Sequence, residues 1–176
     1  ARDAGAAGVQ VGTLFAYCEE SGLAPDLKSS VLEHAARGEV TVRTDPRASP
    51  TGYPFKVVDW PRNPVHGVPR ERVCELGYLR VAYRLPDGRL GYRCAAEPED
   101  QYLSKGGRVE DTIDRQCLCN GLTAAVGLAQ PRENGAVELP VVTSGDDLTG
   151  IAGFLAGRLR YSAADVIDYL LAGAPA

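Results

Sequence analysis

Gly5-Ala-Ala-Gly-Val-Gln-Val-Gly-Thr-Leu-Phe15 is the stretch from which the fold of this chain is inferred. Val9 to Val11 form a short apolar run, interrupted by Gln10, that is typical of a buried strand. Gly12-Thr13 breaks this run, and Thr13 to Ser21 favour a short helix. Backbone N–H groups at a helix start point outward without partners, so the stretch predicts a strand, a turn and a candidate phosphate site.

The same turn also has a purely structural interpretation. A glycine allows a tight bend, and a threonine is a common residue at the N-cap of a helix. Many Gly-Thr pairs before helices therefore bind nothing. From the residues alone, both interpretations stay open.

The composition excludes several classes of protein. The chain has 176 residues, of which 44% are hydrophobic and 24% are charged, as in an ordinary globular protein of one or two domains. The net charge of -4 leaves no basic face for nucleic acid. No apolar run approaches the roughly 18 residues that span a membrane. We expect a cytoplasmic protein with neither nucleic acid nor membrane as partner, and the sequence sets no oligomeric state.

The expected elements alternate between helices and short strands. Apolar spacing, caps and turn residues predict helices, strands and one β-hairpin. The predicted helices are Thr13–Ser21, Pro25–Gly38, Glu97–Leu103, Asp111–Val126, one that begins at Ser144, and one with a Ser162/Asp165 capping box and an apolar stripe of Ala163, Val166, Ile167, Leu170 and Leu171. The predicted strands are Glu39–Arg43, Phe55–Trp60 and the two arms of a hairpin over Tyr78–Cys94. Between them, residues 44–70 carry six prolines and predict an irregular excursion.

Cysteines offer the first candidate chemistry. Cys18 stands alone and predicts a small core residue. Cys74, Cys94, Cys117 and Cys119 could supply four thiolates to a zinc ion, although only Cys117-Leu118-Cys119 has a close spacing. Free thiols in a reducing compartment are the leading interpretation, with a metal site and disulfides as the alternatives.

Other polar residues give weaker signals. His34 and His66 lack a triad context and are interpreted as solvated histidines. Asp146-Asp147 is better explained as stabilisation of the first turn of a helix than as an acid/base pair. Arg115 and Asn120 lie near the last two cysteines and could face a pocket.

Five stretches together resemble the nitronate monooxygenase family of FMN-dependent flavoenzymes. The first two are the opening Gly5–Phe15 stretch and Cys18-Glu-Glu-Ser-Gly22, which are similar to the last strand, turn and helix of that family's barrel. The others are Thr44-Asp-Pro-Arg-Ala-Ser-Pro-Thr-Gly-Tyr-Pro-Phe55, Arg93-Cys-Ala-Ala-Glu-Pro98 and Arg115-Gln-Cys-Leu-Cys-Asn-Gly-Leu122. They resemble the segment after the barrel and a C-terminal extension of one bacterial branch.

This resemblance implies an α/β fold: the last strand and helix of a (β/α)8 TIM barrel, followed by an α+β extension. The implied organisation is the end of an FMN-binding barrel over 1–43, the proline-rich excursion over 44–70 and the extension over 71–176. A whole barrel needs roughly 200 residues or more. We therefore expect this chain to be the C-terminal part of a longer protein.

The resemblance also implies a cofactor site. Gln10, Val11, Gly12 and Thr13 match the second of the two turns that hold the FMN phosphate in the family. The family's catalytic histidine has no match here, so the catalytic residue stays unknown. The implied activity is the oxidation of alkyl nitronates with oxygen. The alternatives are an FMN-dependent enoyl-ACP reductase and, from another class, a non-catalytic interaction module held together by cysteines and zinc.

Overall fold

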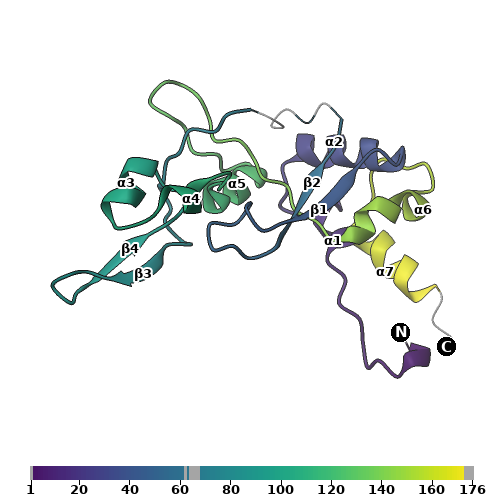
Figure 1. Cartoon of the computed structure of the whole chain (residues 1–176). Coiled ribbons are helices and arrows are strands. Elements are labelled where there is room, and N and C mark those ends of the chain that lie inside the picture. The colour runs from purple at the N-terminus through teal and green to yellow at the C-terminus, as the bar shows by residue number, and fades with distance from the viewer. Residues whose placement is uncertain (1, 62, 64–67, 173–176) are drawn as a thin grey trace. The chain divides into compact units, whose positions relative to one another are not determined.

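The structure is a computed structural model that describes residues 2–61, 63 and 68–172 (Figure 1). The chain divides into two compact units. Unit 1 comprises Ala1–Val42 and Ser144–Ala176, and unit 2 comprises Arg43–Thr143. Residues 144–176 belong to the same unit as the start of the chain, and the predicted break near residue 70 falls inside unit 2.

Unit 1 is helical. Its elements are η1 (Arg2–Ala4), α1 (Thr13–Ala16), α2 (Pro25–Ala36), η2 (Asp146–Gly150), α6 (Ile151–Leu155) and α7 (Ala163–Leu171). Helix α2 confirms the predicted helix from Pro25, with the proline in its first turn and Asp26 beside it. The predicted helix from Ser144 is instead the 3-10 helix η2 followed by α6, and Gly145 rather than Ser144 caps η2.

The core of unit 1 lies where α2 meets η2 and α6 (Figure 1). Val31 and Ala35 of α2 are fully buried, and so are Leu148 and Leu155 from the other side. Helical spacing places Val31 and Ala35 on one face, as the sequence predicts. Residues far apart in the chain therefore share one apolar core.

The predicted strand at the start of the chain was wrong. Residues 9–12 belong to no strand, and the Val9 side chain is 65% exposed. A strand of a parallel sheet needs neighbours for its backbone hydrogen bonds, and the described residues provide none beside this segment. The helix that follows is also shorter than predicted, because α1 ends at Ala16 and not at Ser21.

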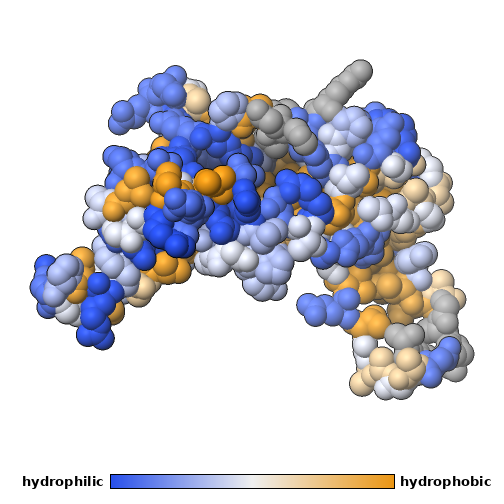
Figure 2. Space-filling model, viewed as in Figure 1, coloured by the Kyte–Doolittle hydropathy of each residue, from blue (hydrophilic) through white to orange (hydrophobic). Residues whose placement is uncertain are grey.

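Helix α7 begins with the predicted capping box. The Ser162 hydroxyl accepts a hydrogen bond from Asp165 N, and the Asp165 carboxylate accepts one from Ser162 N. The predicted apolar stripe is only partly covered, since Val166 is buried whereas Ile167 and Leu171 are exposed. Figure 2 shows this apolar surface around α7.

Unit 2 contains most of the strands and several short helices. Its elements are β2 (Phe55–Asp59), β3 (Val81–Arg84), β4 (Leu90–Arg93), α3 (Glu99–Ser104), α4 (Val109–Thr112) and α5 (Leu118–Ala125). Strand β1 (Thr41–Asp45) crosses the boundary between the units and pairs with β2. These strands and α3 confirm the corresponding predictions within a few residues.

The β3–β4 hairpin forms as its turn residues predict. The strands are antiparallel, with Val81 opposite Arg93 and Arg84 opposite Leu90. Gly88 has φ of 85°, a left-handed conformation that glycine adopts without strain. Its N–H donates to Leu85 O, which closes the turn.

The predicted helix from Asp111 to Val126 was wrong, because the segment forms α4 and α5 with an irregular link. Asp114 in that link has φ of 57°, which no helix interior accepts. Helix α5 restarts at Leu118 and packs Gly121 against Val141. A Cβ on Gly121 would lie 2.5 Å from Val141 Cγ2, so this glycine permits close packing.

The structure shows small sheets and short helices, a mixed α/β composition. The described residues form two separate two-stranded sheets. Assignment to a TIM barrel therefore stays a prediction. In the described part of the chain, no helix is long and apolar enough to cross a bilayer.

Candidate functional site

The predicted phosphate turn lies in unit 1, directly before α1. Gln10 and Gly12 are exposed, Val11 is half-buried, and Thr13 is buried as the first residue of the helix. The four residues are consecutive in the chain. Their exposures differ, and they cannot all contribute in the same way.

The Thr13 hydroxyl is already engaged within unit 1. It donates to Asp147 Oδ1 at 2.6 Å and accepts from Gly145 N at 3.1 Å. Ser144 Oγ lies 3.4 Å from it as a further donor. This hydroxyl therefore ties α1 to the start of η2, and it is not a free donor for a phosphate.

Gly12 is different, because nothing in the chain requires a glycine there. Its φ of -109° and ψ of -56° are open to other residues, and no heavy atom lies within 4 Å of the position of a Cβ. The open space next to this exposed backbone would allow a ligand to approach closely. Of the four predicted residues, Gly12 fits a phosphate contact best.

The cysteines of unit 2 lie near one another. Asn120 Nδ2 donates to Val73 O at 3.4 Å and to Glu75 Oε2 at 2.8 Å, which places the segment around Cys74 beside α5. Burial raises the pKa of the Cys94 thiol, and the neighbouring thiols of Cys74 and Cys119 raise it further. The four predicted cysteines are thus brought into one region by contacts between distant segments.

All five cysteines are free thiols. Within the described ranges, no group of three or more histidine, cysteine or acidic side chains is arranged to hold a metal ion. Burial raises the pKa of the Cys117 thiol to about 11, so this thiol stays protonated at neutral pH. The zinc-held module consequently remains an alternative that needs its own test.

We expect the purified reduced chain to carry five titratable thiols, because no cysteine is in a disulfide, and no stoichiometric zinc, because no group of three or more ligands in the described residues is arranged to hold a metal ion. Ellman's reagent on the unfolded chain counts the thiols, and elemental analysis of the folded chain measures zinc. In the folded chain Cys117 should react slowly, since the thiolate is the reacting form. A Cys18→Ser control should remove one thiol and leave the metal content unchanged. About one zinc per chain would contradict this prediction and support the alternative.

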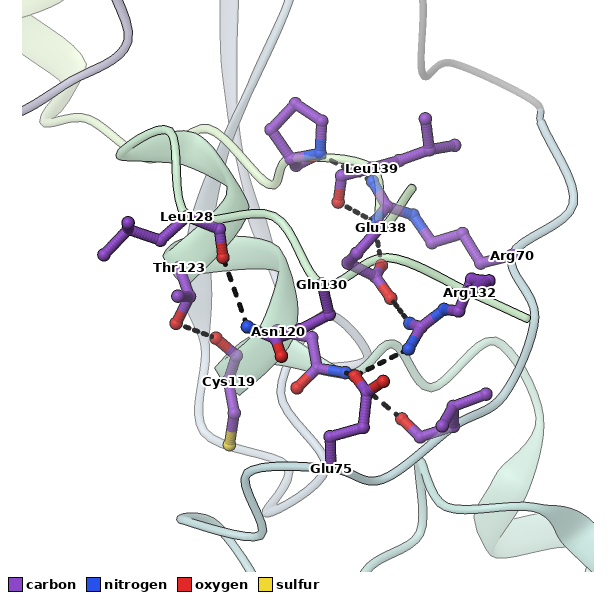
Figure 3. Close-up of polar contacts among 12 residues, drawn as sticks. Arg70, Glu75, Cys119, Asn120, Thr123, Leu128, Gln130, Arg132, Glu138 and Leu139 are labelled. Atoms are coloured by element: carbon purple, nitrogen blue, oxygen red, sulfur yellow. Dashed lines mark hydrogen bonds and ion pairs between the residues drawn. The ribbon is translucent and has the colours of Figure 1, made fainter. Parts of the chain in front are cut away.

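Arginine and glutamate side chains alternate in a network of ion pairs inside unit 2 (Figure 3). Arg132 lies between Glu138 and Glu75, and Glu138 also accepts from Arg70 at 3.1 Å. The side chains of Glu138 and Arg132 are only 5% and 6% exposed. Charges this buried need partners on both sides, so the cluster holds together segments that have little regular structure.

A cleft of about 440 Å³ opens in unit 2. Arg115 and Cys117 line it, together with Arg70, Arg72 and the valines Val57, Val58, Val68, Val141 and Val142. The sequence suggested that Arg115 and Asn120 could face a pocket. Arg115 does so, whereas Asn120 is buried and bonded to Glu75 instead. No sequence signal marked Arg72, because its partners are distant backbone carbonyls.

The remaining candidates have structural environments. His34 Nδ1 pairs with Glu39 Oε2 at 2.7 Å and its side chain is only 15% exposed, so it is not the solvated histidine predicted. His66 lies outside the described residues. Asp146 and Asp147 lie in the first turn of η2, and Asp147 also accepts from Thr13.

Comparison with protein-family models, curated proteins and solved structures finds no significant match to this chain.

Proposed function

We propose that this chain is part of an FMN-dependent oxidoreductase of the nitronate monooxygenase type. Its Gln10-Val11-Gly12-Thr13 turn would hold the FMN phosphate. The motif resemblance supports the proposal, and one structural observation carries it. Gly12 is exposed and has open space where a Cβ would lie, although neither its backbone conformation nor its neighbours require a glycine.

The geometry refines the role of each residue in this turn. Because the Thr13 hydroxyl is bonded to Asp147 and Gly145, we assign the phosphate contact to the exposed backbone at Gly12. Thr13 instead fixes the direction in which α1 leaves the turn. Bound FMN would take electrons from the nitronate and pass them to oxygen.

The proposed location is the cytoplasm. Free thiols persist in a reducing compartment, and all five cysteines of the chain are free.

The proposal predicts that Gly12→Leu lowers flavin retention by about tenfold in the oxidoreductase of which this chain is proposed to be a part. Leucine would occupy the space that the phosphate needs, without a clash in the chain itself. Flavin absorbance after gel filtration measures retention.

A separate measurement distinguishes the two enzyme classes. Oxygen uptake with an alkyl nitronate would indicate the monooxygenase, whereas oxidation of a nicotinamide cofactor would indicate an enoyl reductase.

Gly22→Leu is the matched control. Gly22 also belongs to unit 1 and is also exposed, and no heavy atom lies within 4 Å of the position that its Cβ would take, but it lies beyond the turn. The Gly22→Leu variant should retain flavin as the unmodified protein does. Equal flavin contents in both variants, whether high or low, would remove the support for a site at Gly12.

A further inference from the structure

Two of the arginines that line the cleft of unit 2, Arg72 and Arg115, both donate hydrogen bonds to the end of α4. Arg72 Nη1 donates to Thr112 O at 3.0 Å, and Arg115 Nε donates to Asp111 O at 3.2 Å. The two carbonyls belong to consecutive residues at the end of α4. Both arginines are half-buried and both line the cleft.

The charges of these two arginines are not neutralised by an acidic partner. Arg72 also donates to Glu97 O and Ala95 O, and Arg115 also donates to Pro46 O and Ser49 O. In the described part of the chain, every hydrogen bond of the two guanidiniums therefore goes to a neutral backbone carbonyl. A carbonyl satisfies a donor but leaves the positive charge in place.

The acidic residues of the cleft are mostly engaged elsewhere. Glu138 pairs with Arg70, and Asp114 pairs with Arg47 at 2.6 Å. Asp59 accepts from Trp60 N at 2.9 Å, and Glu71 is exposed. The cleft thus combines two arginines that have no acidic partner with Glu71, whose carboxylate would repel a doubly charged anion more strongly than a singly charged one.

Part of the cleft wall is apolar. Val57, Val58, Val141 and Val142 face it, with Pro69 and Pro140 beside them. A volume of about 440 Å³ lies within the range of small-molecule sites. Arginine pairs bind carboxylates through charge-assisted hydrogen bonds, and valines favour a hydrocarbon chain.

We propose that this cleft binds a small monocarboxylate with a short apolar chain, whose carboxylate contacts Arg72 and Arg115 and whose chain contacts the valines. This binding site is separate from the Gly12 turn and does not depend on FMN.

Hexanoate is the probe for this proposal. Isothermal titration of the 176-residue chain should show saturable binding of hexanoate, and 1-hexanol should bind at least about tenfold more weakly because it lacks the charge. Inorganic phosphate should not compete. Non-saturable hexanoate binding, equal affinity for 1-hexanol, or displacement by phosphate would overturn the assignment.

Arg115→Gln should weaken hexanoate binding about tenfold, since it removes one charge from the cleft. Arg89→Gln is the control, because Arg89 is 79% exposed in the hairpin turn and its replacement should leave hexanoate binding unchanged. Arg115 also holds the carbonyls of Pro46 and Ser49, so its loss could disturb the fold. A second variant, Val68→Trp, tests the same cleft without removing these hydrogen bonds.

Val68 lines the cleft and is 45% exposed, so a larger side chain there would narrow the opening and still be accommodated. Val68→Trp should reduce hexanoate affinity while the melting temperature stays unchanged. Full hexanoate affinity in a folded Val68→Trp variant, or in a folded Arg115→Gln variant, would show that hexanoate binds elsewhere.

Discussion

Replacing Glu138 with alanine should lower the free energy of unfolding of unit 2 by about 3 kcal/mol. The Glu138 carboxylate is 5% exposed and pairs with both Arg70 and Arg132. Without it, the Arg132 side chain, which is only 6% exposed, would remain buried next to Glu75 alone. Removing one member of a buried ion pair is costly mainly because the remaining charge stays away from water.

Fluorescence of Trp60 provides the measurement for this variant. Trp60 is the only tryptophan of the sequence and is buried in unit 2, so urea unfolding followed by its emission reports on that unit. Arg47→Ala is the control, because the Arg47–Asp114 pair is exposed, with side chains 56% and 70% accessible. It should cost less than about 1 kcal/mol. Equal costs for both variants would mean that the buried cluster adds no more stability than a surface pair.

Leu155→Ala should destabilise unit 1 by about 3 kcal/mol. The Leu155 side chain is fully buried and belongs to α6, which packs against α2. Truncation removes apolar contacts and leaves a cavity between elements that the chain order separates widely. Protection of the α2 amides from hydrogen exchange measures the loss.

Leu170→Ala is the matched control for that experiment, since Leu170 in α7 is 39% exposed. Its effect on α2 protection should be small. If Leu155→Ala left the protection of α2 unchanged, residues 144–176 would not supply the core of unit 1.

Elements could be predicted from the sequence where the residues that specify them lie within a few positions of one another. Helix α2 follows from Pro25 and its apolar spacing, and the hairpin follows from Pro86-Asp87-Gly88 between alternating strands. The Ser162/Asp165 capping box was likewise predicted and confirmed. Each of these depends on interactions between residues a few positions apart, which do not require a distant part of the chain.

The wrong predictions share a different cause. The apolar run at Val9–Val11 has the composition of a strand, but a strand also needs a partner beside it. The segment from Asp111 to Val126 has helical composition, but Arg72 and Arg115 bind the carbonyls at the end of α4, and Asp114 turns the backbone away. Tertiary contacts therefore overrode local preference in both segments.

The candidate sites show the same difference between features set by neighbouring residues and features set by distant contacts. The Gln10–Thr13 turn could be proposed from contiguous residues, yet the partner of the Thr13 hydroxyl is Asp147, which lies 134 positions later. The sequence alone determined α2, the hairpin and the cap of α7, because backbone geometry and nearby side chains suffice for them. Only the tertiary structure decided that Thr13 is a structural tie and that Arg72 and Arg115 meet in one cleft. Those contacts join residues whose proximity arises from burying a shared core and from satisfying distant carbonyls.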